Sequence, residues 1–134
     1  MTTGKTERVD IKVSDDVVRV RQATRSFAVA SGLSLVDQTK IVTASSELAR
    51  NALDYGGGGF VTLEMLEAGG RRGLRLTFED RGPGIADVEQ ALKDGFTSGK
   101  GMGLGLGGAK RLSNEFSIVS KPGMGTKVSI ARWK

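Results

Sequence analysis

The chain has 134 residues, which is enough for one domain around a single hydrophobic core and too few for two independent cores. It contains no cysteine and no histidine, which excludes disulfides, thiolate or imidazole metal sites, and catalysis by a Cys nucleophile or a His base. No long apolar run and no charged-then-apolar N-terminus is present, so we expect no membrane span, no cleaved signal and a cytoplasmic location.

The net charge of +5 raises the question of nucleic-acid binding. The basic residues are scattered along the chain, and one Trp and one Tyr offer few rings for base stacking. We therefore interpret these residues as solvated surface groups and expect no nucleic-acid partner. A modest positive field also suits a triphosphate ligand or an acidic protein partner.

The first half of the chain predicts one strand followed by two helices. Apolar and charged residues alternate over 8–13, which predicts a strand with Val13 among its inward residues. A helix is expected over 14–31, before a glycine that can end it. A second helix, over 35–55, begins after the capping residue Ser34, and its apolar residues follow helical spacing.

The second half of the chain predicts strands joined by glycine-rich segments. Two strands, over 60–67 and 74–80, flank a turn rich in glycine and so form a hairpin. The remaining predicted elements are a short helix at 87–93, a glycine loop at 95–103, a helix at 104–115, and strands at 116–120 and 126–132. This organisation is typical of an α+β domain.

Two of the predicted elements place polar side chains beside the core. On the second helix, Glu47, Asn51 and Asp54 form a polar stripe next to the apolar one. Asp80 continues the inward face of its strand, where a carboxylate is costly unless a donor such as an adenine amino group bonds it. The alternatives are a solvated helix face for Glu47 and Asn51, and an ordinary strand-end turn for Asp80.

The glycine-rich segment between 95 and 108 was compared with two known phosphate-binding patterns. Residues 103–108 match the dinucleotide fingerprint G-x-G-x-x-G, but no strand directly precedes them, as that fingerprint requires. The P-loop pattern also fails, because Gly101 stands where Ser or Thr should bind magnesium. We interpret the segment as a lid that leads into a helix N-terminus, whose free amides attract phosphates.

Four short blocks in a fixed order resemble the N, G1, G2 and G3 boxes of the GHKL, or Bergerat-fold, ATPases. This family includes histidine kinases, type II topoisomerases, Hsp90 and MutL. The four blocks are Glu47-x-x-x-Asn51, Asp80-x-Gly82-x-Gly84, Gly101-x-Gly103-x-Gly105 and Gly125-Thr126. Residues 37–51, 94–98 and 110–116 are further similar to the RsbT-type switch serine/threonine kinases of the bacterial stressosome, and this similarity covers almost the whole chain.

The resemblance implies a fold and a domain organisation. The expected fold is a two-layer α/β sandwich of the Bergerat type, with a mixed, mostly antiparallel sheet covered on one face by helices. Residues 1–134 would form a single ATP-binding kinase domain.

The resemblance also implies a role for each matched residue. Asn51 would coordinate a Mg²⁺ ion that bridges the phosphates of ATP. Asp80 would accept a hydrogen bond from the adenine amino group, and the Thr126 hydroxyl would support that contact. Glu47 would be the general base or orienter for an incoming Ser or Thr hydroxyl, whose proton a carboxylate can accept late in phosphoryl transfer.

Glycines and the lid would supply the other implied contacts. The residues concerned are Gly82 and Gly84 beside the base, and Ser98, Lys100, Gly101, Gly103 and Gly105 around the phosphates. Related anti-sigma kinases carry an arginine near Lys100, so this lysine would neutralise the γ-phosphate; the alternative is a solvated lysine. The absence of histidine excludes a histidine-kinase phosphoacceptor, and Asp54 stands where those kinases carry a lysine.

Three function classes are compatible with these residues. The first is a serine/threonine kinase and partner switch, which phosphorylates a STAS-domain antagonist and a stressosome scaffold and, when released, activates a PP2C-type phosphatase. The second is an anti-sigma factor kinase that sequesters a sigma factor and phosphorylates its anti-anti-sigma partner. The third is a non-catalytic ATP-binding module. The match over residues 37–51 favours the first class, and the presence of Glu47 disfavours the third.

Overall fold

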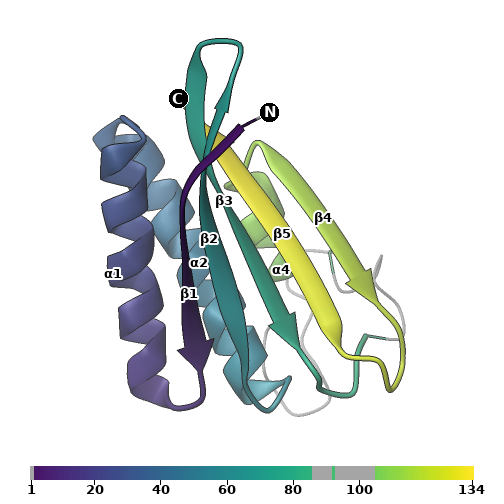
Figure 1. Ribbon diagram of the computed structural model, residues 1–134. Coiled ribbons are helices and arrows are strands. Elements are labelled where there is room, and N and C mark those ends of the chain that lie inside the picture. The colour runs from purple at the N-terminus through teal and green to yellow at the C-terminus, as the bar shows by residue number, and fades with distance from the viewer. Residues whose placement is uncertain (1, 86–91, 93–104) are drawn as a thin grey trace.

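The computed structural model describes residues 2–85, 92 and 105–134 (Figure 1). Its strands form one sheet in the order β1-β2-β3-β5-β4. The strands are β1 (Thr2–Ile11), β2 (Gly59–Ala68), β3 (Arg71–Asp80), β4 (Glu115–Ser120) and β5 (Thr126–Trp133), and the helices are α1 (Ser14–Ala30), α2 (Leu35–Asp54) and α4 (Leu106–Arg111). Figure 1 shows the helices together on one face of the sheet, so the predicted two-layer α+β sandwich is confirmed.

All pairings between the described strands are antiparallel, so the parallel component of the expected mixed sheet is not found among them. The order of the elements explains this. Between β1 and β2 the chain forms two antiparallel helices, which reverse its direction and bring β2 back against β1. The pairs β2–β3 and β4–β5 are hairpins and are antiparallel by construction.

The core lies between the sheet and the inner faces of α1 and α2. Ile41 and Leu48 of α2 are buried against strand residues such as Leu63, Leu76 and Ile130. Burying one such side chain stabilises the fold by about 1.5–3 kcal/mol. This packing holds α2 against the sheet and fixes the position of its last turns near the end of β3 and the start of β5.

The first strand ends earlier than its alternating pattern predicts. Val13 is 56% exposed and lies outside β1. The cause is local, because the backbone N–H groups of Lys12 and Val13 both donate to Asp16 Oδ2, at 2.8 and 3.0 Å. Asp16 thereby caps the start of α1 and turns the chain out of the sheet.

The predicted start of α2 and the predicted β2–β3 hairpin are both confirmed. Ser34 caps α2, since its hydroxyl accepts a hydrogen bond from the Asp37 N–H at 3.1 Å. The hairpin turn is shorter than predicted, because Ala68 already pairs with Arg71 and only two glycines lie between them. Both glycines have positive φ, as a two-residue hairpin turn requires.

The helix predicted over 104–115 is shorter in the structure. It ends at Arg111, and β4 begins at Glu115. The Ser113 hydroxyl donates to the Ala109 carbonyl, whereas the Asn114 N–H donates to the Ala131 carbonyl of β5. Asn114 is thereby drawn into the sheet, and the helix cannot continue.

The helix predicted at 87–93 and the glycine loop at 95–103 lie outside the described residues, with the exception of Leu92, which packs against the core. No helix in the described ranges is long and apolar enough to cross a membrane.

Candidate functional site

Asn51, Asp80 and Thr126 line one small cavity between the end of α2, the end of β3 and the start of β5. Its other walls are formed by Leu48, Ala52, Tyr55, Phe78, Ile85, Leu106 and Val128. The cavity measures about 20 Å³, which is room for one water molecule. A ring as large as a purine therefore enters only if the walls move apart.

Asp80 is the last residue of β3 and is held between two neighbouring strands. Its register partners are Gly59 of β2 and Thr126 of β5. The carboxyl accepts backbone hydrogen bonds from Gly82, at 2.9 Å, and from Thr126. Burial raises the pKa of Asp80 above its ordinary value, and the two backbone donors oppose this shift. The inward orientation predicted for Asp80 is confirmed by its place in the cavity beside Phe78.

The Asp80 carboxyl lies directly against glycine backbone. A Cβ added to Gly56 would be 2.4 Å from Asp80 Cγ, and a Cβ added to Gly82 would be 2.5 Å from Gly56 Cα. Neither position has room for a side chain. Gly84 is buried nearby, and its carbonyl accepts a hydrogen bond from the Tyr55 hydroxyl at 3.0 Å. These glycines thus let the turn after β3 close against the end of α2.

The Thr126 hydroxyl belongs to a network centred on Ser120. Ser120 Oγ accepts from the Ile85 N–H at 2.7 Å, donates to the Gly125 carbonyl at 3.0 Å, and lies 2.8 Å from Thr126 Oγ1. The single proton of Ser120 is used on Gly125, so Thr126 acts as the donor to Ser120. The lone pairs of Thr126 Oγ1 are then available to accept a hydrogen bond from a ligand.

Glu47 and Asn51 lie one helical turn apart near the C-terminal end of α2. Asn51 is partly buried and faces the cavity, whereas Glu47 is exposed. The Glu47 side chain lies against Gly105, the residue that precedes α4, and a Cβ on Gly105 would be 2.5 Å from Glu47 Oε2. Gly105 also has φ +63, so both its backbone and its contact with Glu47 favour glycine.

The arrangement combines an enclosed polar pocket with an exposed carboxylate. Asp80 and Thr126 offer acceptors inside apolar walls, which suits a planar group that carries an amino donor. The Asn51 amide oxygen is a hard ligand of the kind that Mg²⁺ prefers. Among the described residues no cluster of three or more acidic side chains could hold a metal by itself, so a cation here would need phosphate oxygens as further ligands.

Comparison with known families decides the assignment. A family model described as histidine kinase-, DNA gyrase B-, and HSP90-like ATPase matches residues 36–134, well over half of the chain. The chain belongs to this GHKL ATPase family. The relationship proposed from the four sequence blocks is therefore confirmed.

Relatives within the family narrow the assignment further. Over 125 residues the chain is 43% identical to the serine/threonine-protein kinase RsbT of Bacillus subtilis, covering 93% of this chain and 94% of the relative. It is 26% identical over 129 residues to the anti-sigma F factor of Shouchella clausii, covering 90% of this chain and 86% of that protein. The chain therefore belongs to the RsbT-like protein kinases of the GHKL family.

Two solved structures share the fold. One contains the RsbU and RsbW domains of a Mycobacterium tuberculosis protein, with a TM-score of 0.66 over 98% of this chain. The other is the histidine kinase domain of a blue-light-activated kinase from Erythrobacter litoralis, with a TM-score of 0.56 over 96% of this chain. Both are 21% identical to the chain, which spans 33% and 65% of their lengths.

The structure brings most of the predicted site residues together. Asn51, Asp80 and Thr126 share the cavity, Gly82 and Gly84 adjoin it, and Glu47 contacts Gly105. The predicted lid residues Ser98, Lys100, Gly101 and Gly103 lie outside the described residues. The roles assigned to all of these residues remain predictions.

Sequence reasoning missed two residues that shape the site, Gly56 and Ser120. Gly56 is distant in sequence from the Asp80 carboxyl that it accommodates, and only the folded chain brings the two together. The inward side of β4 carries Phe116, Ile118 and Ser120, so a polar residue at the end of this inward face was the available signal for Ser120.

Proposed function

We propose that this protein is a serine/threonine kinase and partner switch that uses Mg-ATP. It phosphorylates a STAS-domain antagonist and a stressosome scaffold and, when released from them, activates a PP2C-type phosphatase in the cytoplasm. The observation that carries the proposal is the convergence of Asn51, Asp80 and Thr126 on one cavity. The 43% identity to a serine/threonine-protein kinase over nearly the whole chain supports the activity.

Within this proposal the cavity receives the adenine ring. The Asp80 carboxyl accepts a hydrogen bond from the exocyclic amino group, and the Thr126 hydroxyl, oriented by Ser120, accepts or relays a second contact. Leu48, Phe78 and Val128 provide apolar walls for the ring. Because the cavity now holds only about 20 Å³, part of the binding energy is used to open it, and we expect modest affinity for ATP without a partner.

The phosphates then extend from the cavity toward the exposed part of α2. The Asn51 amide oxygen would hold the Mg²⁺ ion, which neutralises phosphate charge when bound. Ser98, Lys100 and the glycines Gly101, Gly103 and Gly105 would contact the phosphates. Gly105 supports this arrangement, because it stands at the start of α4 in contact with Glu47.

Glu47 would act on the incoming substrate. A Ser or Thr hydroxyl of the partner attacks the γ-phosphorus, the bond to the β,γ-bridging oxygen breaks, and ADP leaves. Glu47 orients the hydroxyl and accepts its proton. Its exposure suits this role, because the acceptor hydroxyl is carried on another protein and must approach from solvent.

Residues 1–134 would work as a single domain. The family model begins at residue 36, but β1 pairs along β2, and α1 packs on α2 and on the sheet. These contacts support the proposal that the segment before residue 36 belongs to the same domain as the rest of the kinase.

An anti-sigma factor kinase is the second candidate, supported by the 26% identity to an anti-sigma F factor. In that case the protein would hold a sigma factor and phosphorylate an anti-anti-sigma protein. Binding of the purified protein to a sigma factor and to a STAS-domain protein, measured side by side, separates the two candidates.

The test of the proposed function is phosphoryl transfer from γ-labelled ATP to a purified STAS-domain antagonist, with and without magnesium. We expect labelled antagonist only with magnesium. Asn51→Ala should abolish the label while the circular dichroism spectrum stays unchanged, because alanine is a strong helix former and Asn51 is only partly buried. Full activity of Asn51→Ala would contradict the metal role of Asn51.

A further inference from the structure

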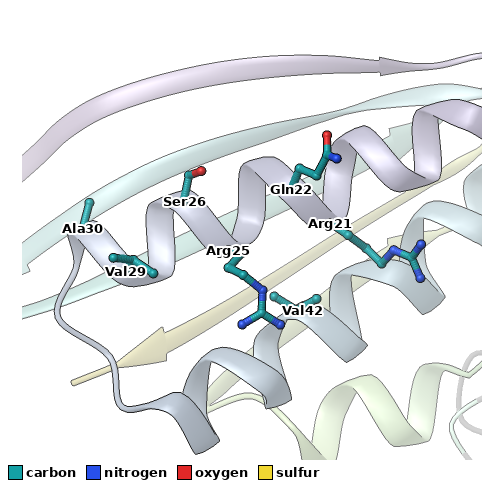
Figure 2. Close-up of a pocket in the computed structure, with 7 residues that line it drawn as sticks. All are labelled: Arg21, Gln22, Arg25, Ser26, Val29, Ala30 and Val42. Carbon is teal, nitrogen blue, oxygen red and sulfur yellow. The ribbon is translucent and has the colours of Figure 1, made fainter.

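A groove runs between α1 and α2, on the side of the helices that faces away from the sheet. It measures about 770 Å³ and is larger than the cavity at Asn51 and Asp80. Figure 2 shows Arg21 and Arg25 extending from α1 toward α2, with Val42 of α2 beside the Arg25 side chain and Val29 one turn further along α1. The groove is separate from Glu47, Asn51 and Asp80, which do not line it.

The groove carries two cationic side chains that have no acidic partner among the described residues. In the described part of the chain no carboxylate lies within ion-pair distance of Arg21 or Arg25, and Arg25 has only a 3.5 Å contact with the neutral Gln38. The closest acidic residue to Gln38 in sequence, Asp37, is paired with Arg132 at 2.8 Å. Two arginines one helical turn apart repel each other, and this repulsion is relieved when an anionic group binds between them.

Val29, Ala30 and Val42 line the same groove as these arginines. Val29, one turn after Arg25, is 57% exposed. Leu35 and Val36, the first two residues of α2, do not line the groove but are also exposed, at 72% and 64%. Exposed aliphatic residues beside unpaired arginines are typical of a protein-binding surface, whereas nucleic-acid surfaces combine basic residues with stacking aromatic rings.

We propose that this groove docks an acidic amphipathic helix of a partner protein. The two ridges formed by α1 and α2 can receive a third helix between them, as in other helix-in-groove complexes. Carboxylates one turn apart on the partner helix would form bidentate pairs with Arg21 and Arg25. An aliphatic residue between these carboxylates would contact Val29 and Val42.

This inference rests on the proposed partner-switch function, because it assigns the groove to one of the partner proteins. The surface lies outside the nucleotide site, so partner docking and catalysis can be lost independently. Val42 and Asn51 are both on α2, and the same rigid helix therefore carries the docking groove and the proposed metal ligand.

The test uses two synthetic helical peptides of about 17 residues, the length of α1. Both carry the same leucine stripe, and they differ in having Glu or Lys pairs at i, i+4 beside it. Each is titrated into the ¹⁵N-labelled full chain. We expect the Glu peptide to shift the amides of 18–30 and 35–42, and the Lys peptide to leave them unchanged.

Charge-reversal variants provide the decisive comparison. Arg21→Glu with Arg25→Glu should weaken binding of the Glu peptide at least about tenfold and leave Mg-ATP affinity unchanged. The matched control reverses Arg71 and Arg72, two exposed arginines of the β2–β3 hairpin, and should keep full peptide binding. If the double groove variant fails to fold, Arg25→Glu alone serves, with a smaller loss.

Several outcomes would overturn the proposal: no shifts with the Glu peptide, equal binding of both peptides, shifts outside the groove, or a single-stranded RNA shifting the same amides as strongly as the Glu peptide. Failure of the wild-type protein to bind ATP would count against the proposed function and leave the docking result interpretable.

Discussion

The carboxyl group of Asp80 fills the space where a side chain on Gly56 would stand, with Asp80 Cγ 2.4 Å from the position of that Cβ. Gly56 follows Tyr55, the C-cap of α2, and Asp80 ends β3. The contact fixes how closely the helix that carries Asn51 approaches the strand that carries Asp80. The polar pocket thus depends on a glycine that contributes no functional group.

Gly56→Ala should therefore lower ATP affinity. Gly56 has no positive φ, so its backbone accepts alanine, but the new methyl group must displace the Asp80 carboxyl or push α2 away. We expect a loss of about tenfold or more in affinity by calorimetry, which corresponds to about 1.4 kcal/mol. The control is Gly4→Ala, whose Cβ would make an ordinary 3.7 Å contact with Met65. Equal affinity of both variants would contradict the proposed geometry.

Asp80→Asn tests the adenine contact, because the substitution should change ATP affinity more than it changes the stability of the fold. The amide can present its donor end to the adenine amino group, so we expect ATP binding to weaken by about 1–3 kcal/mol. The fold should persist, since the amide oxygen can still accept the Gly82 N–H bond, although one acceptor oxygen now serves both backbone donors, Gly82 and Thr126.

The pH dependence of stability gives a second readout for the same variant. Burial raises the pKa of Asp80 in the folded state, so its favourable contribution is complete below the ordinary value of 3.8 and is lost as pH rises through the raised pKa. At neutral pH the ionised carboxyl is therefore less favourable for folding than the protonated form, and Asp80→Asn, whose neutral amide resembles the protonated form, should lose little stability there. The measurement is the free energy of unfolding of the wild type and of Asp80→Asn, obtained with denaturant from below pH 3.8 to neutral pH. A variant that is destabilised only at neutral pH would contradict the raised pKa of Asp80.

Ser120→Ala should weaken ATP binding through Thr126. Without the Ser120 hydroxyl, the Ile85 N–H and the Thr126 hydroxyl both lose a partner, at a cost in unfolding free energy of about 1–3 kcal/mol. Thr126 is then free to rotate, and we expect several-fold weaker nucleotide binding at a temperature where the variant is folded. Ser117→Ala, on the exposed side of the same strand, is the control and should bind ATP normally. Unchanged ATP affinity of Ser120→Ala would remove Ser120 from the site.

Periodicity predicted the placement of Glu47, Asn51 and Asp80, whereas Thr126 was identified only through the resemblance to the GHKL family. The helical spacing of Glu47 and Asn51 and the two-residue period that turns Asp80 inward are local properties, and both hold in the structure. The same period failed at Val13, because hydrogen bonds to Asp16 end the strand before the apolar alternation ends. The sequence pattern alone does not show whether the alternation of the strand or the capping of the helix by Asp16 determines where β1 ends.

Contacts between distant segments were beyond the reach of sequence reasoning. Ser120 meets Ile85 across 35 residues of chain, and Gly56 meets Asp80 only after α2 has packed on the sheet. The groove at Arg21 and Arg25 was also invisible, since in the sequence these arginines are two of many scattered basic residues. Their significance depends on the position of α2 and on the pairing of Asp37 with Arg132.

The central claim is that this chain transfers phosphate by using the polar stripe of α2, and Glu47→Gln tests it most directly. The substitution keeps the size of the side chain and removes the proton acceptor. Mg-ATP should still bind, while single-turnover transfer to a STAS-domain protein should fall by roughly 10²–10⁴-fold. Binding of that protein, measured by pull-down of the same pair, should persist. Wild-type transfer by Glu47→Gln would contradict the account, because Glu47 would then be an exposed helix residue with no part in the chemistry.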